Sequence, residues 1–355
     1  MRSQTFDILK PIDMKHYFAV IALTLIVTCA GIAQGVGVSK SGTTAATFLE
    51  IGVGASAVGM GSAYVSIADD ATALHWNPAG VAGLQQANVI VVHTNWIADT
   101  KFDFAAIAIP LSGLGTVGLS LTSLSMEDMK VRTVDLPEGT GEFFSAGDLA
   151  GSISYSRKLT ERFSIGVTAK YIQQTIWHEN ASAFAIDLGT LFKTDLFGGM
   201  TIGAALSNFG TSMKMSGRDA REFIRLNPGE LGTNGQIPTD IQLDSWDLPL
   251  LFQFGVSTRI FDNEMYRWTI AVDALHPNDN YESVNGGTEV SFYDILFVRA
   301  GYQSLALDQS EGGLSLGVGV SSSNVMDNMK ISFDYAYENM GRLEGVHVLT
   351  LGLRF

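Results

Sequence analysis

The chain has 355 residues, of which 46% are hydrophobic and 16% are charged. It is too apolar for a disordered chain and long enough for one large domain or two. Its net charge of −14 argues against nucleic acid as a partner, because phosphate binding requires clustered lysine and arginine.

The first 33 residues have the features of an export signal. The apolar run 17–30 follows Lys15, ends in small residues and is too short to span a membrane comfortably as a helix. Gly31-Ile32-Ala33 is an acceptable cleavage site, so we expect a signal peptide over residues 1–33 and a mature start near Gln34.

Two details of this signal have alternatives. Met14 is a more natural start than Met1, and Cys29 also allows a lipoprotein interpretation, although Val27-Thr28 is a poor lead-in. Because Cys29 is the chain's one cysteine, the mature chain would have no disulfide, zinc–thiolate site or cysteine nucleophile. No later apolar run reaches about 18 residues, which excludes a helical membrane protein.

Residues 34–87 precede any strand pattern and form a segment of their own. The run 59–80 is rich in small residues and has no sustained alternation, and Asn77 before Pro78 favours a turn. The motif residues of this segment are Gly59, Gly61, Asp69, Asp70, Trp76, Asn77, Pro78 and Ala79.

From residue 88 to residue 355 the chain alternates between an apolar face and a small or charged face, as strands with two different faces do. Ile331, Phe333 and Tyr335, for example, stand opposite Ser332 and Asp334. We predict about fourteen strands, near 88–96, 102–110, 115–125, 148–157, 163–176, 182–193, 200–209, 250–260, 267–275, 286–293, 295–304, 312–321, 329–338 and 346–355.

This alternation fits either a soluble β-sandwich or a transmembrane antiparallel β-barrel. The export signal, the strand length and the last strand, which ends on Phe355 as the expected barrel-insertion terminus, favour the barrel. A charge facing lipid would cost about 2–4 kcal/mol at the bilayer midplane. We therefore expect the charged strand residues to face the lumen, namely Lys170, Asp187, Asp273, Arg299 and Asp334.

Short turns alternate with longer connections, which are 126–146, 210–249 and 276–285. If residue 88 starts from the periplasm, both termini are periplasmic and 210–249 lies outside. That loop carries apolar residues in a number typical of an interface or of a cap over the barrel mouth. The candidate partner-binding residues are Phe223, Ile224, Leu226, Ile237, Ile241, Leu243 and Trp246.

Both ends of the chain resemble a known family. The run 59–80, with Trp76-Asn77-Pro78-Ala79-Gly80, and the end 346–355 resemble the PorV/PorQ family, which is related to the FadL-type transporters. Ser62 and His75 depart from the usual pattern. The resemblance implies a FadL-like barrel of about fourteen strands in the outer membrane of a Gram-negative-type bacterium, with the N-terminal segment folded into the lumen as a plug.

The same resemblance implies a function in type IX secretion without chemistry of its own. The implied partners are the translocon barrel and the C-terminal domains of secreted cargo, which would pass to the attachment machinery, with outer-membrane lipid around the barrel. The alternatives are a FadL-like passive transporter of hydrophobic small molecules and a purely structural barrel. Asp69, Asp70 and Asn77 would fix the plug or, alternatively, contact a ligand.

The sequence offers no motif for an enzyme, a metal or a cofactor. The six histidines are scattered, and no nucleophile elbow or Walker loop is present. Asn278-Asp279-Asn280 could help to hold calcium, but such loop carboxylates are usually only solvated. We therefore predict no catalytic residue, no metal site and no cofactor.

Overall fold

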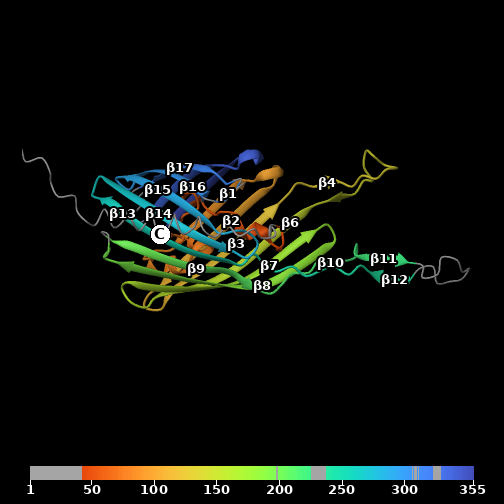
Figure 1. Ribbon diagram of the computed structural model, residues 1–355, viewed down its shortest axis with the longest axis horizontal. Helices are drawn as coiled ribbons and strands as arrows, with labels where there is room; N and C mark the ends of the chain where they lie inside the picture. Colours follow the sequence, from red (N-terminus) through yellow and green to blue (C-terminus); the bar gives the residue numbers. More distant parts are fainter. Residues whose placement is uncertain are drawn as a thin grey trace, which may run out of the picture.

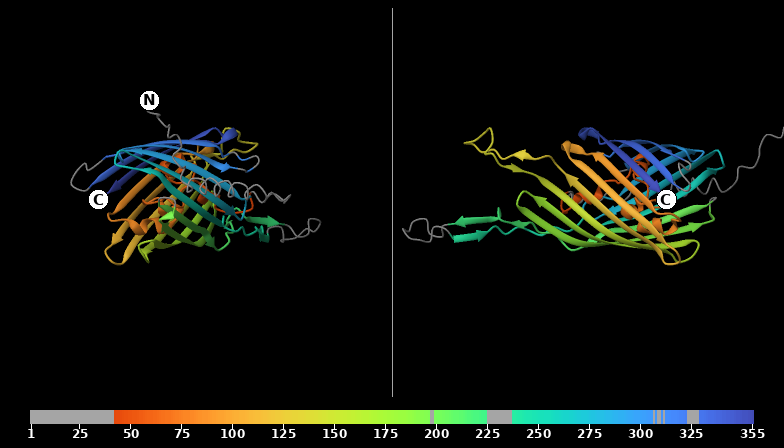
Figure 2. Two further views of the ribbon diagram at one scale, coloured as in Figure 1. Left: turned by 60° about the vertical axis from the view of Figure 1, so that its left-hand side comes forward. Right: turned by 180° about the vertical axis from the view of Figure 1, so that it is seen from behind.

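The computed structural model describes residues 42–196, 199–224, 237–305, 307, 310, 312–322 and 329–355. The signal peptide expected over residues 1–33, and Leu226 of the long loop, lie outside these residues. Fourteen antiparallel strands close into a barrel around the N-terminal segment (Figures 1 and 2). Within the described ranges, no helix is long and apolar enough to cross a membrane.

The barrel strands are β1 (Asn88–Asn95), β2 (Lys101–Leu111), β3 (Gly115–Ser125), β6 (Ala146–Lys158), β7 (Phe163–Ile176), β8 (Glu179–Thr194), β9 (Met200–Gly210), β13 (Leu251–Asp262), β14 (Tyr266–Pro277), β15 (Ser283–Phe292), β16 (Leu296–Leu305), β17 (Leu314–Ser321), β18 (Lys330–Asn339) and β19 (Gly345–Arg354). Each strand pairs with its neighbour in sequence, and β1 pairs with β19 to close the barrel. The predicted fourteen-stranded barrel is confirmed, with strand ends that shift by a few residues.

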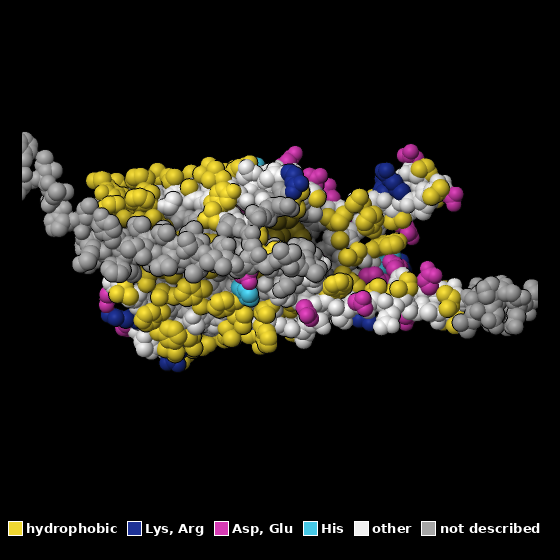
Figure 3. All heavy atoms as spheres, in the orientation of Figure 1, with side chains coloured by type: hydrophobic (Ala, Val, Ile, Leu, Met, Phe, Trp, Pro, Cys, Tyr) yellow, Lys and Arg dark blue, Asp and Glu magenta, His cyan; other side chains and the backbone are white. Residues whose placement is uncertain are grey.

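The two faces of the wall follow the alternation of the sequence. In β8, Ala183, Ala185 and Asp187 are buried inside the barrel, whereas Phe184 and Ile186 are exposed outside it. The outer surface is therefore a broad apolar area, which Figure 3 shows in yellow over the barrel wall. Lipid is the environment that such a surface requires.

The two ends of the barrel differ. Two long connections lie at one end of the barrel, which we call the loop end. Their described residues, 126–145 in one and 211–224 with 237–250 in the other, project from that end (Figures 1 and 2). The opposite end, where Phe355 lies, is the turn end. The projections contain the short strands β4 (Met129–Lys130), β5 (Phe143–Phe144), β10 (Ser216–Gly217), β11 (Arg221–Ile224) and β12 (Ile237–Asp240), and two other loop-end connections contain the short helices η3 (Ile97–Asp99) and η5 (Gly341–Leu343).

The segment before β1 runs through the lumen from the loop end to the turn end. Thr44 forms a bridge with Asp247 at the loop end, whereas Ala87 exchanges backbone hydrogen bonds of 2.9 and 3.0 Å with Phe355 at the turn end. Thr44 therefore lies at the loop end and Phe355 at the turn end. Because β1 starts and β19 ends at the turn end, the segment before β1 crosses the lumen before it joins the wall. We call residues 43–87 the plug, and its helices are η1 (Thr47–Glu50), α2 (Ala55–Gly59), α3 (Ala73–Trp76) and η2 (Pro78–Gly83).

Candidate functional site

Glycines on the inner face of the wall allow the plug backbone to lie directly on the strands. A Cβ built on Gly203 would lie 2.5 Å from the carbonyl oxygen of Val65, so any larger residue there would displace the plug. The wall glycines in such close contact with the plug are Gly166, Gly189, Gly203, Gly255, Gly287, Gly301 and Gly317. The plug is thus fitted to the wall along its length.

Asn77 is fully buried, and both polar atoms of its side-chain amide form hydrogen bonds. Nδ2 donates to the carbonyl oxygens of Val65 (2.9 Å) and Thr190 (3.0 Å), while Oδ1 accepts from the N–H of Ala79 (3.1 Å). Pro78 follows as the first residue of η2, where a missing N–H costs nothing. These contacts hold the plug together and to β8.

The other motif residues also contact protein. Trp76 Nε1 donates to the carbonyl oxygen of Val53 (2.8 Å), and the N–H of Gly61 donates to Ser315 Oγ (3.0 Å). Gly59 lies against Gly317 of the wall. Asp70 accepts from the N–H and hydroxyl of Thr72, whereas Asp69 is exposed and lies 3.6 Å from Arg354.

The structure places all five charged strand residues inside the barrel, each with a polar partner. Lys170 Nζ lies 2.7 Å from Asp187, and Arg299 donates to Glu289 (2.7 Å) and Asp334 (2.6 Å). The Asp273 carboxylate accepts from the N–H groups of two plug residues, Tyr64 (2.7 Å) and Val65 (2.9 Å). Within the described ranges, no group of three or more His, Cys, Asp and Glu residues could hold a metal ion.

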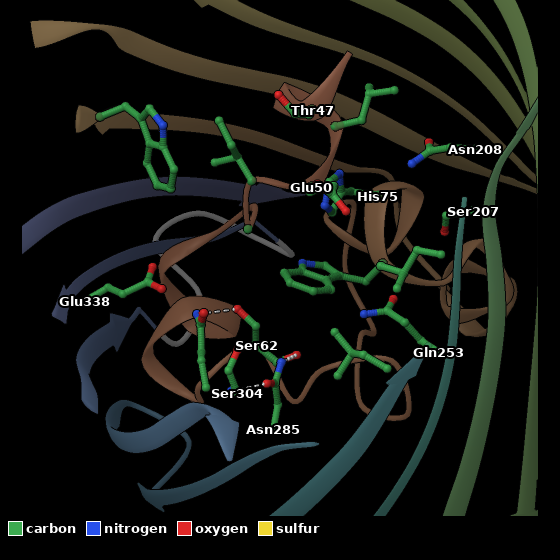
Figure 4. Close-up of a pocket in the computed structure, with 18 of the residues that line it drawn as sticks. Thr47, Glu50, Ser62, His75, Ser207, Asn208, Gln253, Asn285, Ser304 and Glu338 are labelled. Carbon is green, nitrogen blue, oxygen red and sulfur yellow. Dashed lines mark hydrogen bonds between the residues drawn. The ribbon is translucent and has the colours of Figure 1, made fainter. Parts of the chain in front are cut away.

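A cavity of about 340 Å³ lies between the plug and the wall (Figure 4). We call it the loop-end cavity, because its wall residues, such as Gln253, Asn285 and Glu338, lie near the loop ends of their strands. Glu50 and His75 enter it from the plug. The lining combines carboxylates, amides and hydroxyls with Trp76 and Trp96.

Residues 211–224 and 237–250, the described parts of the connection between β9 and β13, form a long projection, which we call the second hairpin. Its base is anchored, because Met213 and Leu248 are buried and the backbones of Met213 and Trp246 exchange two hydrogen bonds of 2.8 Å. Beyond the base, β11 and β12 pair as a two-stranded ribbon. Of the candidate partner-binding residues, Phe223, Ile224, Ile241 and Trp246 are exposed, while Ile237 and Leu243 are half-buried.

Residues 126–145 form a second projection at the same end, which we call the first hairpin. Its strands β4 and β5 pair only with each other among the described strands. Val134 is 99% exposed, and Met129, Leu136 and Phe143 are each more than half exposed. Two hairpins that carry exposed apolar side chains among charged ones therefore rise from one end of the barrel, outside the wall surface that lipid would cover (Figure 2).

Sequence reasoning missed several residues of this site. It did not single out Glu50, Gln253 or Glu338, nor the apolar residues of the first hairpin. An acidic or amide residue on the inner face of a strand, with no basic residue opposite, was the available signal for Glu338 and Gln253. The wall glycines could have been found as glycines at inward positions of the alternation.

The fold and the membrane-facing wall define an outer-membrane β-barrel with a luminal plug. A family model described as "Type IX secretion system protein PorV" matches residues 37–237, which is more than half of the chain. The chain belongs to the PorV family of the Gram-negative outer membrane. Among curated proteins, no sequence matches it.

Solved structures of similar fold include transporters of small molecules. The Pseudomonas putida toluene transporter TodX has 10% sequence identity and a TM-score of 0.51, over 85% of this chain and 97% of that one. The Ralstonia pickettii toluene transporter TbuX has 12% identity and a TM-score of 0.50, over 85% and 97% of the two chains. At such identities the likeness shows the fold alone.

Proposed function

We propose that this barrel binds the C-terminal domains of secreted cargo and passes them from the type IX translocon to the attachment machinery. The mechanism is protein binding, with no covalent step. The observation that carries the proposal is the pair of hairpins that project from the loop end with exposed apolar side chains. Membership of the PorV family supports type IX secretion as the process in which this binding would act.

The first and second hairpins have the properties of a protein-binding surface. Phe223, Trp246, Val134 and Phe143 are large apolar side chains exposed at 66%, 47%, 99% and 54%. Because they lie beyond the wall, lipid does not explain their exposure, and clustered exposed apolar residues typically mark interfaces. Among the described strands neither ribbon pairs with a third strand, so its outer edges can pair with a strand of a β-rich partner.

In the orientation we propose, the turn end is periplasmic and the loop end faces outward. Short turns at one end and long loops at the other are typical of bacterial outer-membrane barrels. Cargo would then meet the first and second hairpins on the outer side, after translocation.

The test removes the ribbon of the second hairpin but keeps its base. Ala220 and Ile241 are joined by a backbone hydrogen bond of 2.7 Å, so residues 221–240 can be replaced by a two-residue Gly-Ser turn. The tagged variant and the wild type are recovered from membranes in mild detergent, and the retained proteins are identified by mass spectrometry. A matched control replaces 159–162, at the turn end, with the same turn.

We expect the wild type and the control to retain a large translocon barrel or secreted proteins that share a C-terminal β-domain. We expect the variant to lose the secreted proteins while it still shows the heat-dependent electrophoretic mobility of a folded barrel. Unchanged retention by the variant would contradict the role of the second hairpin. Recovery of the wild type alone, with bound lipid or hydrocarbon, would instead favour the transporter function.

The alternative function is passive transport of hydrophobic small molecules. The fold that the chain shares with toluene transporters supports it. The loop-end cavity is a mixed argument for it, because Leu49, Ile51, Leu251, Leu275 and Met340 line it together with carboxylates and amides. Burial of a hydrocarbon against such groups would remove water from them without replacing its hydrogen bonds.

A further inference from the structure

The loop-end cavity contains one amide, that of Gln253, and two carboxylates, those of Glu50 and Glu338, that have few or no partners among the described residues. Gln253 is 3% exposed, and no described residue forms a hydrogen bond with its side-chain amide. Glu338 is 5% exposed and receives a hydrogen bond from Gln303, but no described lysine, arginine or histidine pairs with it. A buried carboxylate without a cation is costly, so this arrangement points to a missing partner.

Glu50, which is exposed and lines the cavity, adds a second carboxylate from the plug. It forms no ion pair within the described ranges, and the charge that acts on it is the like charge of Asp279. Burial and Asp279 raise the pKa of Glu50 to about 7, as expected for a carboxylate that lacks a counter-ion. Figure 4 shows Glu50 and Glu338 approaching the cavity from different elements, the plug and β18.

The one positively charged residue of the described lining already has partners. Lys170 is the lysine of the cavity, and its Nζ lies 2.7 Å from Asp187 and 2.9 Å from Asn208 Oδ1. His75 is neutral, because burial and the charge of Lys170 lower its pKa to about 3. When Glu50 and Glu338 are ionised, the described lining therefore has no free cation to pair with them.

The remaining groups suit a cationic head group. Trp76 and Trp96 present aromatic surface to the cavity, and aromatic faces attract ammonium and guanidinium groups. The side-chain oxygens of Gln253 and Ser207 can accept N–H hydrogen bonds, and among the described residues none donates to either of them. A volume of about 340 Å³ is in the lower range of small-molecule sites.

We propose that the loop-end cavity binds a small organic cation, with Glu338 and Glu50 as its charge partners and Gln253 as a hydrogen-bond acceptor. The ligand enters from the loop end, because the plug fills the lumen below the cavity. Two carboxylates beside aromatic and aliphatic side chains suit an organic cation better than a hydrocarbon. The inference rests on the cavity and is independent of cargo binding at the first and second hairpins.

The test compares three five-carbon probes of different charge and one aromatic hydrocarbon. The purified full-length barrel in detergent is titrated by calorimetry with 1,5-diaminopentane, 1,5-pentanediol, glutarate and toluene at pH 8. The variants are Glu338→Gln, Glu50→Gln and the double variant, and Glu161→Gln is the matched control, because Glu161 is an exposed residue at the turn end. The electrophoretic mobility before and after heating verifies that each variant is folded.

We expect the diamine to bind while the diol and glutarate do not, because only the diamine supplies positive charge. Each single carboxylate variant should weaken diamine binding about tenfold, which corresponds to about 1.4 kcal/mol, and the control should leave it unchanged. The proposal is overturned if no probe binds, if toluene or glutarate binds as tightly as the diamine, or if the folded double variant keeps the wild-type affinity.

Discussion

Asn77 of the plug donates its side-chain amide to the carbonyl oxygen of Thr190 in the wall, at 3.0 Å. Thr190 lies in β8, so this bond joins two residues 113 positions apart. The same amide group reaches Val65, and the side-chain oxygen holds the N–H of Ala79. A single buried side chain thus fixes two turns of the plug to each other and to the barrel.

Replacing Asn77 should loosen the plug without unfolding the wall. Asn77→Ala removes the hydrogen bonds to Val65, Ala79 and Thr190, and each buried backbone group left unsatisfied costs about 1–3 kcal/mol. We expect faster cleavage of the plug by an added protease while the barrel keeps its heat-dependent mobility. Asn95→Ala is the control, because Asn95 is exposed on β1. Equal protease resistance of N77A and wild type would mean that Asn77 does not fix the plug.

The wall glycines predict a second way to displace the plug. A Cβ on Gly301 would fall on the backbone of Met60 and Gly61, so Gly301→Val requires the plug to move. Overpacking typically costs about 1–3 kcal/mol. Gly151→Val is the control, because nothing lies within 4 Å of a Cβ at that position.

Labelling of a cysteine introduced into the plug can measure this displacement. The one native cysteine, Cys29, lies in the expected signal peptide, so Val58→Cys would give a mature chain with a single thiol. Val58 is 1% exposed, and a water-soluble maleimide should react slowly with V58C alone or with the G151V control. We expect at least tenfold faster labelling with G301V, and equal rates would contradict a plug held by close contact.

Arg299 should stabilise the barrel chiefly because it neutralises the carboxylates of Glu289 and Asp334. It is 6% exposed and binds both Glu289 and Asp334, so Arg299→Met leaves two carboxylates in the lumen without a cation. Removal of one partner from a buried ion pair costs about 3–5 kcal/mol. We expect a lower denaturant midpoint for R299M and partial recovery in R299M/E289Q/D334N. A triple variant no more stable than R299M would contradict this pairing argument.

The wall was predictable because the bilayer imposes a local rule on every strand. Apolar and inward residues alternate in β8, where Phe184 and Ile186 face outward and Asp187 faces inward, and the sequence displays that period directly. The charges could be assigned to the lumen for the same reason. Their partners could not, because nothing near Arg299 in sequence indicates that it meets Asp334.

The interior was not predictable from local patterns. The plug has no period, and its contacts join distant residues, such as Gly61 and Ser315, which are 254 positions apart. The loop-end cavity likewise combines Glu50, Gln253 and Glu338 from three elements. Such sites depend on which distant segments the closed barrel brings together. A short stretch of sequence does not contain that information.

Glu50 gives the barrel a predicted dependence on pH. Burial, with a smaller effect of Asp279, raises the pKa of Glu50 from its ordinary 4.5 to about 7. The folded protein then binds this proton more tightly than the unfolded chain does, so the contribution of Glu50 to stability falls as pH rises from 4.5 to about 7. In Glu50→Gln the group does not titrate, and this part of the decline should disappear.

The measurement is the denaturant midpoint of wild type, E50Q and the control E161Q at pH 5, 6, 7 and 8. The wild type and E161Q should lose stability between pH 5 and pH 7 by more than E50Q does, because only E50Q lacks the carboxyl group whose pKa is raised inside the barrel. At pH 8 E50Q should be the most stable of the three, since it has no negative charge at this position to be repelled by Asp279. Parallel curves for all three proteins would show that Glu50 titrates as it does in water, and that the barrel does not raise its pKa.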